Sequence, residues 1–352
     1  MKQRVLILCG GRSDEHEISL ISAHGILGAL DRNLFEPLVV GISKKGVWHL
    51  HTDSKYFTVG EIRADKIALN ESTPTISLQP FLNENGTGRL YSEGRAIDFD
   101  LAFPILHGPF GEDGTIQGLL DTIQIPYVGS KCGASWVCMD KAVTKSICEK
   151  QGIPVTPSVV IQRISELDPL MEQIHAFGFP LFVKPARLGS SVGISRITSS
   201  VELRLAVDQA LKYDTKCLIE KGIVGRELEC GVLGKSHDAK ATLPAEIIPP
   251  PDIGWYSYDA KYLNASSQTI VPAQLKPEVQ SRIQKFSLDA YRALECDGMA
   301  RVDLFLIDQT DEIFLSEVNT IPGFTPISLY PKMWQASGIA YSDLITKLLK
   351  GA

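Results

Sequence analysis

Short apolar runs alternate with helical patterns over the first 130 residues, and this alternation constrains the fold more than any other feature of the chain. The apolar runs are VLILC, PLVVGIS and DLAFPIL, and the helical patterns are EISLISAHGILGAL and DGTIQGLLDTI. Short strands that alternate with helices are typical of a mostly parallel sheet covered on both faces. We therefore expect an α/β fold that begins with a doubly wound parallel sheet. The polar stretch 53–94 interrupts the pattern, and we expect a hairpin or surface excursion there.

The rest of the chain predicts two α+β units. The first opens with the helical pattern WVCMDKAVTKSICEKQG, capped by Ser135, and continues through the apolar runs FPLFVKPA and CLIEK. The second contains ELECGVLG, AEIIP, a helix near 277–295 and the strand pair RVDLFLI and IFLSEVN. A chain of 352 residues exceeds one typical core. Length alone predicts two or three units, and the pattern of elements leads us to expect three, at 1–131, 132–223 and 224–352.

Composition and charge argue against several classes of protein. The net charge is −6 and no Lys/Arg run appears, so the basic surface of a nucleic-acid binder is missing. The N-terminal apolar run spans only Val5 to Cys9, which is too short for a signal sequence or a membrane span. The seven cysteines lack C-x-x-C spacing, which argues against a disulfide framework or a zinc site. We expect a cytoplasmic protein that binds neither nucleic acid nor membrane.

The strongest chemical signal is the last predicted strand pair. If its turn centres on Thr310, Asp303 faces Glu317 and Arg301 faces Asn319. Because side chains alternate along a strand, all four then lie on one face at one end of the hairpin. Two carboxylates and an amide oxygen are hard ligands that suit Mg²⁺ shared with phosphates. The alternative, a solvated polar edge, fits poorly because the flanking residues are apolar, although a one-residue slip in register would spoil the geometry.

A second signal is Lys184, which ends an apolar run and precedes the loop RLGSSVG. A lysine beside a Gly/Ser loop offers fixed charge and backbone N–H donors to a phosphate, although the Walker A order is absent. The loop alone is as typical of a flexible turn as of a phosphate clamp, and the lysine favours the clamp. Glu220 and Glu227 follow at a strand end, where carboxylates can hold ribose hydroxyls, but exposed glutamates are common.

Two further segments have more than one interpretation. Glu17 lies three residues after Asp14 at a predicted helix start, which is the spacing of a capping box, yet the helix N-terminus is also an anion site. The segment HGPFGEDGTIQG carries His107, Glu112 and Asp113. Its glycines indicate a turn that feeds a helix, so we interpret it as a loop lining a site, with His107 as a polar contact.

Together these segments resemble the D-alanine–D-alanine ligase family over almost the whole chain. The motifs that carry the resemblance are GGRSDEHEISL, LHGPFGEDGTIQG, CMDKAVTK, FVKPARLGSSVGISR, LIEKGIVGRELE, YDAKYL, RVDLFL and EVNTIPGFTPISLYP. Each is moderately specific, and all eight in order are very specific. The resemblance implies an ATP-grasp fold, in which two α+β units sandwich ATP. It also implies the ATP-dependent ligation of two D-alanine molecules through an acyl phosphate, for peptidoglycan synthesis.

The resemblance further implies which residues hold ATP and metal. The ATP site would comprise Lys141, Lys184, Ser191, Glu220, Lys221, Ile223, Glu227 and a lid lysine, Lys261. Two Mg²⁺ or Mn²⁺ ions would bind Asp303, Glu317 and Asn319, and the family leaves room for a monovalent cation. The loop 249–270 has the length and composition of a closing lid.

For the amino-acid substrates, the resemblance replaces the capping interpretation of Glu17. It implies that Glu17 holds the ammonium of the first D-alanine and is linked to Ser190 and Tyr262. The other implied contacts are His107 near the first carboxylate, Arg301 and the Gly323 N–H as an oxyanion hole, and Ser328 and Leu329 around the second substrate. The family commonly forms homodimers.

Two alternatives remain at this point. One is a D-alanine–D-lactate ligase or another ATP-grasp carboxylate–amine ligase, against which the tyrosine of YDAKYL argues. The other is a non-catalytic nucleotide-binding regulator with this fold. A regulator has no need of an arginine beside a pair of metal-ligating carboxylates, so the chain favours an enzyme.

Overall fold

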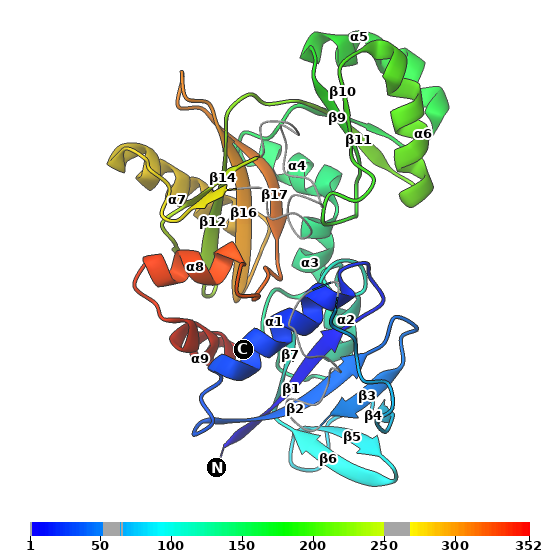
Figure 1. The fold of residues 1–352 in the computed structure, drawn as a ribbon, viewed down its shortest axis with the longest axis vertical. Coiled ribbons are helices and arrows are strands. Elements are labelled where there is room, and N and C mark those ends of the chain that lie inside the picture. The colour runs from blue at the N-terminus through cyan, green and yellow to red at the C-terminus, as the bar shows by residue number, and fades with distance from the viewer. Residues whose placement is uncertain (1, 52–63, 65, 250–267) are drawn as a thin grey trace.

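The computed structural model describes residues 2–51, 64, 66–249 and 268–352. Its described strands form four sheets. In Figure 1 the N-terminal sheet lies at the bottom, the sheet of residues 158–221 at the upper right, and the sheet of residues 226–319 at the upper left. No helix within the described ranges is both long and apolar enough to cross a membrane.

The first sheet has the strand order β3-β2-β1-β7. Strand β1 (Gln3–Gly10) pairs in parallel with β2 (Phe35–Ile42) and β7 (Leu101–Pro104), and β3 (Trp48–His51) is antiparallel to β2. Helix α1 (His16–Ala29) packs on one face and α2 (Thr115–Thr122) on the other. The expected doubly wound, mostly parallel sheet is therefore confirmed.

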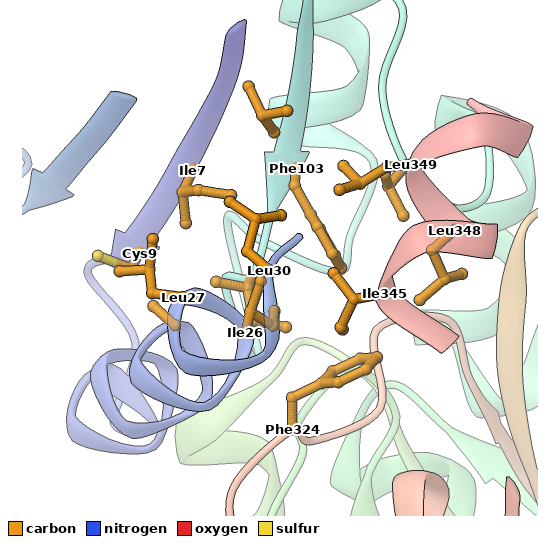
Figure 2. Close-up of a cluster of buried hydrophobic side chains, with 14 of the residues drawn as sticks. Ile7, Cys9, Ile26, Leu27, Leu30, Phe103, Phe324, Ile345, Leu348 and Leu349 are labelled. Atoms are coloured by element: carbon orange, nitrogen blue, oxygen red, sulfur yellow. The ribbon is translucent and has the colours of Figure 1, made fainter. Parts of the chain in front are cut away.

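The face of this sheet that carries α1 also receives the end of the chain. Helix α9 (Tyr341–Gly351) packs beside α1, with Ile345 and Leu348 in the same core as Ile7 and Phe103 (Figure 2). Phe324, which follows the last strand of the third sheet, lies in this core as well. The first and last segments of the chain thus share one core, which fixes the loop after residue 319 against the N-terminal sheet.

The polar excursion forms a small antiparallel sheet. Strand β5 (Gly88–Ser92) pairs with β4 (Ile76–Leu78) and β6 (Arg95–Phe99). The expected hairpin is therefore present, although it extends past residue 94. Residues 52–63 and 65 of the stretch lie outside the described residues.

The predicted helix from Trp136 to Gly152 is wrong as a single element. The structure has two helices there, α3 (Cys132–Met139) and α4 (Lys141–Lys150), which are separated by Asp140. The Asp140 carboxylate accepts hydrogen bonds from the backbone of Ala142 and Val143 at 3.1 and 3.2 Å, so it caps a new helix. Ser135, the predicted cap, lies inside α3 and donates to the Ser130 carbonyl instead.

The second sheet is antiparallel, in the order β10-β9-β11-β8. Its strands are β8 (Ser158–Ile161), β9 (Leu181–Pro185), β10 (Ser195–Ile197) and β11 (Cys217–Lys221). Two helices, each preceded by a 3₁₀ turn, cover one face: η2 (Ile164–Glu166) with α5 (Leu167–Phe177), and η3 (Ser200–Glu202) with α6 (Leu203–Tyr213). The opposite face is left for the third sheet and the loop after β9.

The third sheet has the order β15-β14-β12-β16-β17, with β13 (Lys240–Ala241) also paired to β12. Its other strands are β12 (Arg226–Leu233), β14 (Ala245–Ile248), β15 (Gln268–Ile270), β16 (Met299–Leu306) and β17 (Ile313–Asn319). Helix α7 (Pro277–Ala293) packs on it through Val279 and Ile283, and α8 (Leu329–Ala336) packs near β14. All described pairs in this sheet are antiparallel.

The pairing of β16 with β17 confirms the expected register at the polar end of the hairpin and corrects the register nearer the turn. Arg301 faces Asn319 and Asp303 faces Glu317, as expected. A bulge follows Asp303, so Leu304 faces Leu315. The turn is therefore not centred on Thr310, as one uniform register along the hairpin would require. An extra residue on β17 lets both strands keep apolar side chains inside while the polar end stays in place.

Candidate active site

Two adjoining cavities lie beside the third sheet. The first, of about 180 Å³, is bounded by side chains of the second and third sheets, among them Lys184, Glu220, Glu227, Asp303 and Glu317. The second, of about 110 Å³, lies toward the N-terminal unit and is lined among others by Glu15, His107, Ser190, Arg301 and Ser328. Gly189, Ser190, Glu229 and Glu317 line both. A ligand in one cavity therefore meets a ligand in the other.

A row of three carboxylates crosses the third sheet where the cavities meet. Glu229 of β12 faces Asp303 of β16, which faces Glu317 of β17. Like charges on neighbouring strands repel, so the row requires cations. The predicted ligands Asp303, Glu317 and Asn319 do lie on one face. Their oxygens are the donor type that Mg²⁺ takes, so the set fits a divalent cation.

In this structure protein cations engage those carboxylates. Arg301 donates from Nε and Nη2 to the two oxygens of Asp303, both at 2.7 Å, and Lys141 Nζ lies 3.3 Å from Glu317 Oε2. Asn319 Oδ1 accepts from the Ile321 amide at 3.0 Å. Among the described residues, no group of three or more His, Cys, Asp or Glu side chains converges as a ready metal cage. Metal binding here would require Asp303 to share its oxygens.

Arg301 is the buried cation of this cluster. Besides Asp303 it contacts Glu229, with 3.2 Å from Nε to Oε2. Burial lowers the pKa of the guanidinium, but the charges of Asp303 and Glu229 outweigh burial and hold the pKa well above its ordinary value. Arg301 is therefore a permanent positive charge on the wall of the second cavity, as an oxyanion-binding residue requires.

A second buried cluster, in which lysines outnumber carboxylates, lies in the first cavity. Glu220 at the end of β11 forms ion pairs with Lys184 at 2.7 Å and with Lys145 at 3.0 Å. Burial raises the pKa of Glu220, but the two ammonium groups outweigh it and keep the pKa lowered. Lys145 also donates to the Thr156 carbonyl at 2.9 Å. Lys145 was not predicted, although it belongs to the motif CMDKAVTK, one helical turn after Lys141 on α4.

Lys141 lies at the junction of the cavities. It begins α4, is 7% exposed, and donates to the Leu188 carbonyl at 2.7 Å. Leu188 belongs to the predicted phosphate loop, so Lys141 ties that loop to Glu317 on the third sheet. The remaining predicted nucleotide contacts that line the first cavity are Ser191, Lys221, Ile223 and Glu227.

The loop after β9 has a strained backbone. Ser190 and Ser191 adopt positive φ angles of 49° and 60°, which residues with a Cβ rarely take. Such strain is concentrated at functional sites. Gly189 leaves room for Glu15: a Cβ there would lie 2.8 Å from a carboxylate oxygen of Glu15, which would have to shift. The loop is thus held against the N-terminal unit by Glu15.

The predicted link between Glu17 and Ser190 is wrong. The Ser190 hydroxyl donates to Glu15, which lines the second cavity. Glu17 is instead paired with Lys44 at 2.7 Å and is absent from that lining. The capping box is also wrong, because α1 begins at His16 with Glu15 at the N-cap position. Sequence spacing does not show which of the two glutamates, Glu15 or Glu17, reaches the second cavity. Because α1 begins at His16, the glutamate that lines this cavity is Glu15.

His107 is anchored on three sides at the back of the second cavity. Its Nδ1 lies 3.1 Å from the Ile321 carbonyl and 3.4 Å from Glu112 Oε1, and Ser22 Oγ is 3.0 Å from Nε2. A carbonyl only accepts, so Nδ1 donates its proton to the Ile321 carbonyl. Burial raises the pKa of the Glu112 carboxyl, partly offset by His107. Sequence reasoning had left Glu112 without a role.

The segment after β17 completes the second cavity. Gly323, Ser328 and Leu329, which the resemblance assigned to the oxyanion hole and the second substrate, all line it. Ser328 Oγ accepts from the Thr325 amide at 3.0 Å, and a Cβ on Gly323 would come within 2.6 Å of this oxygen. Gly323 is therefore required for close packing of the turn. Lys261 and Tyr262, and with them most of the expected lid, lie outside the described residues.

Comparison with known proteins identifies the family. The model for the D-ala D-ala ligase N-terminus matches residues 4–130, and the model for the C-terminus matches residues 147–350. The chain is 42% identical over 351 residues to D-alanine–D-alanine ligase A of Escherichia coli, which covers 99% of this chain and 95% of the relative. A D-alanine–D-alanine ligase from a Thermoanaerobacter species is 43% identical over 354 residues, with 99% and 96% covered.

Solved structures agree. A D-alanine–D-alanine ligase from Coxiella burnetii superposes with a TM-score of 0.82 at 33% identity and covers 99% of this chain and 93% of its own. The VanG D-Ala:D-Ser ligase from Enterococcus faecalis gives 0.83 at 34%, with 99% of each chain covered. With two sheets enclosing the lysine-rich first cavity and both family models matched in order, the chain belongs to the D-alanine–D-alanine ligase family of ATP-grasp enzymes.

Proposed function

We propose that this protein joins two D-alanine molecules into D-alanyl-D-alanine at the expense of ATP, releasing ADP and phosphate. The observation that supports this most is the junction of the two cavities at Ser190, Glu229 and Glu317. A nucleotide held by Lys141 and Lys184 in the first cavity would present its terminal phosphate to an amino acid in the second. The family membership supports the choice of D-alanine for both substrates.

In the first step, the carboxylate of one D-alanine attacks the γ-phosphorus of ATP, and ADP leaves. The ammonium of this D-alanine would be held by Glu15, the carboxylate that the second cavity provides in place of Glu17. Lys141 and Lys184 neutralise the phosphates. A Mg²⁺ or Mn²⁺ pair bound by Asp303, Glu317 and Asn319 would supply further charge neutralisation to the transferred phosphoryl group.

In the second step, the neutral amine of another D-alanine attacks the carbonyl of the acyl phosphate, and inorganic phosphate leaves. The tetrahedral intermediate carries an oxyanion, which Arg301 and the backbone N–H of Gly323 would stabilise. Ser328 and Leu329, which also line the second cavity, would hold the second D-alanine. Acyl phosphates hydrolyse readily, so the site must exclude water, a task that the segment 249–270 would serve.

Other expectations belong to the same proposal. We propose a cytoplasmic homodimer acting in peptidoglycan precursor synthesis, with units at 1–131, 132–223 and 224–352 and room for a monovalent cation. The dimer is tested by sedimentation equilibrium of the purified chain. A single species at the mass of one chain, at the concentrations used for assay, would contradict it.

The activity is tested by phosphate release from ATP with D-alanine, L-alanine, D-serine or D-lactate as the amino or hydroxy acid. We expect phosphate release with D-alanine and a product with the mass of D-alanyl-D-alanine. The rate of dipeptide synthesis should rise toward alkaline pH, because more of the amine is then neutral. In a competition between D-alanine and D-lactate at neutral pH, the dipeptide should dominate. A depsipeptide as the main product would favour the D-lactate alternative, and no product from any acceptor would contradict a ligase.

A further inference from the structure

Glu229 is a buried carboxylate at the active site to which neither the sequence nor the proposed mechanism gives a role. It lies on β12, is 5% exposed, and lines both cavities. Across the ladder it faces Asp303, at one end of the row that Glu317 completes. Burying a carboxylate is costly unless a cation compensates for it. Among the described residues, Arg301 is a cation in contact with it, with Nε 3.2 Å from Glu229 Oε2.

Asp303 has two partners to satisfy under the proposed function. Both of its oxygens accept from Arg301 at 2.7 Å, and Asp303 also lines the first cavity beside Glu317, with which it would hold a divalent cation. A guanidinium that relies on Asp303 alone neutralises the charge that the metal needs. A second carboxylate paired with Arg301 neutralises part of the charge of the guanidinium. More of the negative charge of Asp303 is then available to the metal.

We propose that Glu229 is a positioning residue that holds Arg301 while Asp303 ligates the divalent cation. This inference rests on the proposed function. Glu229 keeps the guanidinium on the wall of the second cavity, where the oxyanion forms, and allows one oxygen of Asp303 to turn toward the metal. Arg301 thus passes part of its ion pairing from Asp303 to Glu229 when the metal binds.

The test is Mn²⁺ binding to the purified chain with a non-hydrolysable ATP analogue, followed by electron paramagnetic resonance of free Mn²⁺. Glu229→Gln should weaken Mn²⁺ binding by about tenfold, the lower end of the cost of losing a group that orients a metal ligand. Glu229→Asp, which keeps the charge, should recover part of that loss. Unchanged Mn²⁺ affinity in Glu229→Gln would overturn the proposal.

A matched control is available in the same sheet. Glu246 on β14 is also buried and accepts two hydrogen bonds from Arg226, at 2.7 and 2.6 Å, but lines neither cavity. Glu246→Gln should leave Mn²⁺ affinity unchanged while lowering the urea midpoint. If both variants weaken Mn²⁺ binding equally, the effect reports general loss of stability, and the proposal fails.

A double-mutant cycle separates action through Arg301 from direct attraction of the metal by Glu229. In an Arg301→Met background, Glu229→Gln should change Mn²⁺ affinity less than twofold, because the residue that it positions is gone. A full tenfold loss in that background would make Glu229 a direct contributor and overturn the positioning role. Phosphate release by the wild type with D-alanine tests the proposed function independently, since the Mn²⁺ titration requires no turnover.

Discussion

The two buried ion clusters of the active site differ in the sign of their excess charge. In the first cavity, one carboxylate, Glu220, is flanked by two lysines, Lys145 and Lys184. At the junction of the cavities, the carboxylates of Glu229, Asp303 and Glu317 face two cations, Arg301 and Lys141. Counted over the described residues alone, the first cluster has a surplus of one positive charge and the second a surplus of one negative charge.

This difference indicates what each cluster is built to receive. A buried surplus charge is costly and persists where a ligand compensates for it. Under the proposed function, phosphate would complete the lysine-rich cluster and a divalent cation would complete the carboxylate-rich cluster. Both clusters border the first cavity, so under the proposed function metal and phosphate would meet where Glu317 lines both cavities.

The largest effect should come from removing charge in the carboxylate cluster. Glu317→Gln keeps the size of the side chain but brings the surplus to zero, and we expect kcat to fall by about 10³-fold, as for loss of a main electrostatic contact in a transition state. The measurement is phosphate release at saturating Mg²⁺, ATP and D-alanine, with circular dichroism as the folding control. Turnover near that of the wild type would show that the cluster binds no catalytic metal.

A smaller effect should follow when the charge is kept and the geometry is lost. Arg301→Lys leaves the net charge of the cluster unchanged. However, a lysine ammonium cannot reproduce the planar guanidinium, which contacts both Asp303 and Glu229. We expect kcat to fall by about 10²-fold with both substrates saturating. A kcat within a factor of about two of the wild type would mean that only the charge of Arg301 matters.

The lysine cluster should respond through nucleotide binding rather than turnover. Lys145→Met removes the surplus positive charge and leaves Lys184 paired one to one with Glu220. The KM for ATP should therefore rise about tenfold, the equivalent of about 1.4 kcal/mol, while kcat changes little. Lys145→Arg should restore part of the affinity. An exposed control is Lys285→Met, which breaks only the surface pair with Asp289. An unchanged KM in Lys145→Met would assign Lys145 to folding alone.

The smallest effect is a pH dependence of stability carried by Glu220. Its pKa is lowered in the folded protein, so its contribution is complete above the ordinary value of 4.5 and is lost as pH falls through the folded pKa. The difference in urea midpoint between wild type and Glu220→Gln should be constant from pH 7 to about 5 and shrink below that. A difference that grows on acidification would contradict an ionised Glu220.

The sequence predicted the active-site residues unevenly, and the reason is the range of the contacts involved. Asp303, Glu317, Arg301 and Asn319 were placed correctly because a hairpin pairs residues close in the chain, and alternation then fixes the face. The bulge after Asp303 was not foreseen, since either strand can carry an extra residue without changing the apolar pattern. The helix break at Asp140 had a local signal, an N-cap residue inside an amphipathic pattern.

Long-range contacts were beyond sequence reasoning. Glu229 joins the carboxylate row only because β12 pairs with β16, and nothing in ELECGVLG indicates which strand will lie beside it. Glu15 was passed over for Glu17 because the choice depends on a loop from the second sheet reaching the start of α1. Lys145 belonged to a quoted motif, but its role appears only when Glu220 lies against it.

By itself, the sequence determined the α/β class, the parallel N-terminal sheet, the polar face of the last hairpin and the family, because each depends on periodicity or on motifs within a short stretch. Tertiary structure alone decided that α9 returns to the first sheet, that Glu15 meets Ser190, and that Glu229 shares Arg301 with Asp303. The physical reason is that a side chain's charge and polarity are local properties. The partner that compensates for a buried charge is chosen by packing among elements distant in the chain.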